Sequence, residues 1–209
     1  MTKTLAEWKA RLKEQKRQER NAIDAFVSAL PLDDGGETAM RAFDALFEFG
    51  AAPWGLIFKR VQGVDASPAF REQFLQSWVV CGDAIRNDCQ GDLDLTKGLR
   101  CLLPVYSGSG MTLYRGDGFE SRRTRRYGMS WTSDKEVARD FAQGKARLCI
   151  GGGVLLETVA PPEAIICAPA LLNNGYEEDE YIVDRRFLGG VRVIERYPEV
   201  PFDAPATVL

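Results

Sequence analysis

The chain has 209 residues, 45% hydrophobic and 27% charged, which is enough for one large domain or two small domains with a genuine core. It carries a formal net charge of −3 and no histidine. The charge gives no general attraction to nucleic acid or anionic membranes, and the lack of histidine excludes Ser-His-Asp and Cys-His catalysis and His-ligated zinc. Acid–base chemistry must therefore come from carboxylates, Lys, Arg, Tyr or Cys.

The cysteines point to a reducing compartment. They are odd in number and scattered, and none forms a Cys-x-x-Cys pair: Cys81, Cys89, Cys101, Cys149 and Cys167. This pattern is typical of free buried thiols. The charged start lacks the apolar segment of a signal peptide, and no apolar run approaches the ~20 residues that cross a bilayer. We therefore expect a cytoplasmic protein with no membrane contact and no metal site.

Residues 1–105 are predicted to form a helical region. Thr4 is predicted to cap a first helix, in which Leu5, Trp8 and Leu12 form one apolar stripe. Lys and Arg residues at 9–20 occupy other positions of this helix. We interpret this basic face as solvated; the alternative is docking to nucleic acid or to a nucleic-acid-bound partner. Apolar spacing predicts further helices at residues 39–49, 70–85 and 95–103.

From residue 106 the pattern changes to short runs rich in β-branched and aromatic residues. One helix interrupts them. Ser133 and Glu136 have the spacing of a capping box, and Val137, Ala138 and Phe141 then give the helix an apolar face. The sequence therefore predicts an α+β protein with a helical region at 1–105 and a β-rich domain at 106–209. Strands are predicted at 111–115, 129–132, 154–159, 164–167, 181–183 and 191–194.

An arginine followed by glycine ends the first predicted strand. The guanidinium of Arg115 offers a planar set of donors that suits a phosphate, and Gly116 lets a ligand approach the backbone closely. On the next strand, alternation places Ser130 and Thr132 on one face and Trp131 on the other. Taken singly, Arg115 is more typical of a surface residue at a strand end, and Ser130 and Thr132 are more typical of an edge strand with polar residues facing outward.

Two carboxylates precede the fifth predicted strand. Glu178 and Glu180 stand two residues apart and share a face if the segment is extended. A carboxylate beside a ribose can accept its hydroxyl proton and stabilise an oxocarbenium-like centre as the bond at C1 breaks. Two neighbouring carboxylates also raise each other's pKa, which suits one of them for receiving a proton. A solvated acidic turn is the alternative.

Together, these motifs resemble the Arg-Ser-Glu class of mono-ADP-ribosyltransferases, a fold found in bacterial toxins and phage enzymes. The resemblance covers residues 107–197 and leaves out the helical region. It implies a split, mostly antiparallel β-sandwich as the core of residues 106–209. The usual Ser-Thr-Ser is here Ser-Trp-Thr, which keeps the inward hydroxyls. The matching motifs are Leu113-Tyr114-Arg115-Gly116, Ser130-Trp131-Thr132-Ser133 and Glu178-Asp179-Glu180-Tyr181.

The resemblance implies a role for each residue. Arg115 would hold the phosphates of NAD and the backbone of Gly116 its nicotinamide amide. Ser130 would orient the catalytic glutamate and, with Thr132, help to hold the nicotinamide ribose. Glu180 would bond that ribose and stabilise the oxocarbenium transition state. Glu178 occupies the position where members that modify arginine carry a glutamate.

The implied function is transfer of ADP-ribose from NAD, used as a substrate, to an acceptor protein with a target arginine. Two alternatives remain open: an NAD glycohydrolase that uses water, and an NAD- or protein-binding module without catalysis. No direct contact with nucleic acid is expected. A basic run lies between the first two motifs, and we interpret it as a solvated helix face, with contact to the adenosine phosphate or an acidic protein as the alternative: Arg122, Arg123, Arg125 and Arg126.

Overall fold

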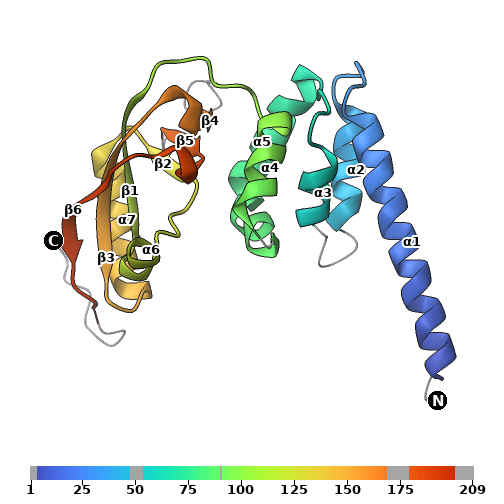
Figure 1. Ribbon diagram of the computed structural model, residues 1–209, viewed down its shortest axis with the longest axis horizontal. Helices are drawn as coiled ribbons and strands as arrows, with labels where there is room; N and C mark the ends of the chain where they lie inside the picture. The colour runs from blue at the N-terminus through green and yellow to red at the C-terminus, as the bar shows by residue number, and fades with distance from the viewer. Residues whose placement is uncertain (1–3, 48–53, 90, 169–178, 201–209) are drawn as a thin grey trace. The chain divides into compact units, whose positions relative to one another are not determined.

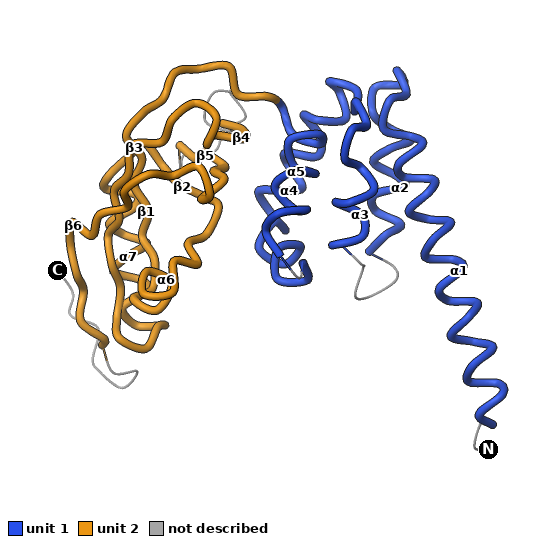
Figure 2. The backbone as a smooth tube through the Cα atoms, in the orientation of Figure 1, with its two compact units in different colours: residues 1–104 blue, residues 105–209 orange. Residues whose placement is uncertain are grey.

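The computed structural model describes residues 4–47, 54–89, 91–168 and 179–200 (Figure 1). The chain divides into two compact units, Met1–Pro104 and Val105–Leu209 (Figure 2). This division falls one residue from the boundary at 105/106 that the sequence predicts. The described residues combine helices with an antiparallel sheet, so the predicted α+β class is confirmed.

Aromatic side chains build the core of the first unit. Phe43 contacts the rings of Phe26, Trp54 and Phe74, and all four residues are buried. The helix at Trp54–Arg60 escapes the sequence prediction because its apolar stripe is only two turns long. The helices described in this unit are α1 (Leu5–Ala29), α2 (Glu37–Phe47), α3 (Trp54–Arg60), α4 (Pro68–Asp88) and α5 (Asp92–Leu102).

Helix α1 begins as predicted, and its first turns are solvated. Thr4 and Glu7 form a full capping box at its start. The first buried residue of the helix is Ile23, and Leu5 and Trp8 keep 67% and 57% of their surface exposed. The basic side chains at 9–20 are also exposed, in agreement with a solvated face.

The second unit is organised around one sheet, where the sequence predicts a split sandwich. The described strands pair in the order β4-β5-β2-β1-β3-β6, and every pairing is antiparallel. The shortest pairing among the described strands is that of β1 with β2, which share the single register pair Tyr114–Thr132. The strands are β1 (Met111–Gly118), β2 (Ser130–Thr132), β3 (Gly153–Ala160), β4 (Ile165–Cys167), β5 (Glu180–Val183) and β6 (Val191–Tyr197).

Helix α7 (Lys135–Leu148) covers one face of this sheet, and its N-cap corrects a prediction. The cap is Asp134, whose carboxylate accepts hydrogen bonds from the amides of Glu136 and Val137. The sequence pattern predicts Ser133 as the cap. Asp134 takes the position because one carboxylate oxygen serves two of the free amides of the first turn.

The buried face of α7 consists of small residues. Ala138, Ala142 and Ala146 lie four residues apart and are buried, whereas Phe141, predicted to point inward, is 48% exposed. A Cβ at Gly116 would lie 2.3 Å from the backbone nitrogen of Ala142, so β1 and α7 touch at backbone distance. A phenylalanine ring has no room in this contact.

The opposite face holds the larger core. Leu113, Trp131, Tyr181 and Val183 are buried there together with apolar residues of β3 and β4. The connection from β5 to β6 crosses this face, and Leu188 packs against the cluster. Short helices flank the connection and the end of β1: α6 (Phe119–Thr124), η1 (Pro162–Ala164) and η3 (Arg185–Phe187).

Candidate functional site

The three predicted motifs lie on neighbouring strands. Thr132 on β2 pairs with Tyr114 on β1 and with Glu180 on β5. Arg115 directly follows Tyr114. The register therefore brings the arginine, hydroxyl and carboxylate motifs to one region of the sheet, where the strands β5, β2 and β1 lie next to one another (Figure 1). This region is also where β1 and β2 separate after their single pair.

The guanidinium of Arg115 bridges the gap between β1 and β2. Its Nε donates to Oδ2 of Asp117 at 2.7 Å, and its Nη1 donates to the carbonyl oxygen of Ser130 at 2.5 Å. The group lies so close to Gly128 that a Cβ there would be 2.0 Å from Nη2. The arginine side chain is 18% exposed and is therefore fixed in position before any ligand arrives.

Asp117 is a member of this site that the sequence analysis missed. Its side chain is buried and also accepts hydrogen bonds from the amides of Gly118 and Gly128. Burial acts to raise the pKa of Asp117, but the charge and hydrogen bond of Arg115 and the Gly118 amide outweigh it and hold the pKa below its ordinary value. The signal was present, because residues 115 and 117 share a face of a strand.

Strand alternation places the predicted residues on two faces of the sheet. Thr132 and Glu180 share the α7 face with their partner Tyr114. Arg115 belongs with Leu113 and Asp117 on the opposite face, and it reaches β2 through the backbone of Ser130. The Arg115 side chain therefore lies on the opposite face of the sheet from Thr132 and Glu180, although the three residues stand on the adjacent strands β1, β2 and β5.

The two hydroxyl residues of β2 differ in their surroundings. Ser130 is exposed, whereas Thr132 is 6% exposed and its Oγ1 accepts a hydrogen bond from the Asp134 amide at 3.0 Å. Trp131 is buried on the other face, so the predicted alternation is confirmed. The Thr132 hydroxyl thus helps to shape the turn into α7, and its contact with a cofactor stays a prediction.

Glu180 is half-buried at the first position of β5. Its carboxylate lies near Cys167: burial raises the pKa of that thiol to about 12, and the charge of Glu180 contributes to the rise. Asp179 before it has a positive φ of 43°, which turns the chain as it enters the strand. Glu178 lies outside the described residues, so the predicted carboxylate pair is not placed.

Gly116 has a structural reason to be glycine. Its Cα is covered by the backbone of α7, and a Cβ at this position would lie 2.4 Å from the carbonyl oxygen of Ala138. Close packing of helix on strand therefore accounts for the residue type. The predicted contact of its backbone with nicotinamide stays a prediction.

No family model, no curated protein and no solved structure matches the chain. Function is therefore inferred from its own residues and their geometry. Within the described residues, no helix is both long and apolar enough to cross a membrane. Across the same ranges, Cys, Asp and Glu side chains do not gather in groups of three or more that could hold a metal ion.

Proposed function

We propose that the second unit is an NAD-dependent mono-ADP-ribosyltransferase that transfers ADP-ribose to a protein side chain, with arginine as the acceptor, and releases nicotinamide. The observation that carries the proposal is the register of Thr132, which pairs with both Tyr114 and Glu180. Motifs far apart in the sequence stand on adjacent strands there, and each carries a group that the proposed reaction uses.

The chemistry assigns one task to each group. The bond between the ribose C1 and the nicotinamide nitrogen breaks, and its electron pair leaves with nicotinamide. Positive charge then develops on the ribose, where the half-buried carboxylate of Glu180 stabilises it. A guanidinium nitrogen of the acceptor forms the new bond to C1 and passes a proton to the carboxylate of Glu178. Arg115, already fixed by Asp117, supplies a preorganised cation for the phosphates of NAD.

The test uses the full chain, labelled NAD and a cell lysate. We expect labelled protein bands with the wild-type chain and none with Glu180→Gln, which keeps size but removes the charge. Asp179→Asn is the matched control, because asparagine tolerates a positive φ and the change removes a neighbouring charge. Unchanged thermal midpoints show that each variant folds. Absence of labelling by the wild type, or equal labelling by Glu180→Gln, contradicts the proposal.

The acceptor is tested separately through Glu178. Glu178→Gln should lose transfer to protein but keep nicotinamide release. The reason is that water, as the acceptor, depends less on activation by a second carboxylate than an acceptor arginine does. Mass spectrometry of the labelled proteins should place ADP-ribose on arginine. Nicotinamide release by the wild type without protein labelling contradicts transfer and identifies a glycohydrolase.

A further inference from the structure

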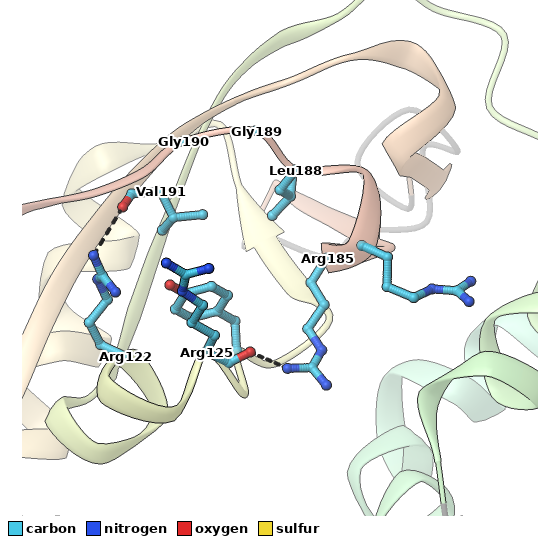
Figure 3. Close-up of a pocket in the computed structure, with 9 residues that line it drawn as sticks. Arg122, Arg125, Arg185, Leu188, Gly189, Gly190 and Val191 are labelled. Carbon is cyan, nitrogen blue, oxygen red and sulfur yellow. Dashed lines mark hydrogen bonds between the residues drawn. The ribbon is translucent and has the colours of Figure 1, made fainter.

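A cavity of about 430 Å³ in the second unit is lined by four arginines (Figure 3). One wall comes from α6 and the turn after it, with Arg122, Arg125 and Tyr127. The other wall comes from the connection between β5 and β6, with Arg185 and Arg186. Among the described residues, no carboxylate lines it. The remaining lining residues are Leu188, Gly189, Gly190 and Val191, so glycine backbone is also open to the cavity.

The two walls are held together by hydrogen bonds of the arginines themselves. Arg185 Nη1 donates to the carbonyl oxygen of Arg125, and Arg122 Nη2 donates to that of Val191 at 3.5 Å. Figure 3 draws both contacts. Arg186 is anchored by Asp184, which is fully buried and accepts from its Nε at 2.9 Å and its Nη2 at 2.6 Å. The cavity is therefore built before a ligand enters.

Arg122 also carries an unused donor. Its Nε is buried and finds no hydrogen-bond acceptor among the described residues. A buried donor of this kind is rare in folded proteins and calls for an explanation such as a bound ion. The guanidinium groups of Arg122 and Arg125 belong to the same wall and carry like charges, and an anion bound beside them would reduce their repulsion.

We propose that this cavity binds a small phosphate-bearing ligand, held by the guanidinium groups of Arg122 and Arg125. Guanidinium forks match phosphate oxygens in charge and geometry. The volume suits more than a single phosphate ion, since pockets for small ligands run from about 300 to 1,000 Å³. The cavity is large enough for a diphosphate group. The cavity shares no residue with Arg115, Ser130, Thr132 or Glu180, so this proposal does not depend on the proposed transferase activity.

The experiment titrates pyrophosphate into the full chain by calorimetry at constant ionic strength. We expect binding to the wild type, weakened at least about tenfold by Arg125→Gln, because a charge-assisted hydrogen bond is lost. The matched control is Arg126→Gln, an exposed neighbour that does not line the cavity, and it should bind within about twofold of the wild type. Arg122→Gln and its helix neighbour Arg123→Gln form a second pair, with thermal midpoints as the check on folding.

Parallel titrations with inorganic phosphate, ADP and NAD identify the source of the phosphate group. Tighter binding of ADP than of pyrophosphate identifies a nucleoside diphosphate, and equal binding identifies the diphosphate alone; both support the site. Two results overturn it: no binding of any of these ligands at millimolar concentration, or equal losses in Arg125→Gln and Arg126→Gln.

Discussion

Thr132 lies directly opposite Glu180 across the β2–β5 pairing, and its Oγ1 accepts the amide of Asp134 at the start of α7. One residue thus joins the strand of the candidate catalytic carboxylate to the helix that covers the sheet. Substituting Thr132 tests the structural role of its hydroxyl and leaves the carboxylate of Glu180, to which the chemistry is assigned, in place.

Thr132→Val should lower the free energy of unfolding by about 1–2 kcal/mol, because the Asp134 amide loses its acceptor while the side-chain volume is kept. Urea unfolding measures the change. Thr112→Val, at an exposed position of β1, is the control and should stay within about 0.5 kcal/mol of the wild type. Equal effects at the two positions would show that the hydroxyl of Thr132 is not needed.

Gly116→Ala should destabilise the second unit by about 3 kcal/mol, because its Cβ would fall 2.3 Å from the backbone of α7, which cannot move aside cheaply. Gly144→Ala provides the contrast. Gly144 lies exposed within α7 with open space around it, so alanine should stabilise the helix by about 0.5–1 kcal/mol. Thermal or urea unfolding of both variants checks the opposite signs.

Asp117 should make stability depend on pH. Its pKa is lowered in the folded chain, so it stabilises the fold above the unfolded value of about 3.9, and that contribution is lost as the pH falls through the folded value. At pH 7, Asp117→Asn should cost about 3 kcal/mol, because Arg115 is left without its charge partner. Urea unfolding at several pH values should show this gap shrinking below pH ~4; a gap independent of pH would contradict the ion pair.

Cys167 should resist alkylation. Burial raises the pKa of its thiol to about 12, so little thiolate forms at pH 8, and the side chain is 1% exposed. Peptide mass spectrometry after iodoacetamide treatment should find Cys167 modified at least about a hundredfold more slowly than the partly exposed Cys149. Similar rates in the native protein would contradict the burial, and similar rates in urea are the control.

Residue type and spacing locate the described strands of the second unit well, because alternation and flanking glycines are local signals. The turn into α7 is less certain from sequence, since Ser133 and Asp134 both qualify as caps and only geometry decides between them. The exposure of Phe141 follows from the contact of Gly116 with α7, which involves residues far apart in the chain. Spacing within one helix carries no information about such a contact.

The candidate site, too, has a part that the sequence predicts and a part that only the structure shows. Arg115, Ser130 and Glu180 stand out by type, and the strand register that relates them follows from pairing that no local pattern encodes. The arginine cavity is harder still. Arg125 and Arg185 are 60 positions apart, and they meet only because the β5–β6 connection crosses the sheet.

The strand order has a consequence for how the protein is made. Among the described strands, only β1–β2 and β4–β5 are paired neighbours in the sequence; β2 pairs with β5, and β3 with β6. During synthesis, β1 can pair with β2 and β3 early, while the pairing of β2 with β5 has to wait until Glu180 leaves the ribosome. Such nonlocal pairing is slow. The last strands to join thus bring Glu180 and the arginine cavity with them, so a nascent chain has neither until the second unit is nearly complete.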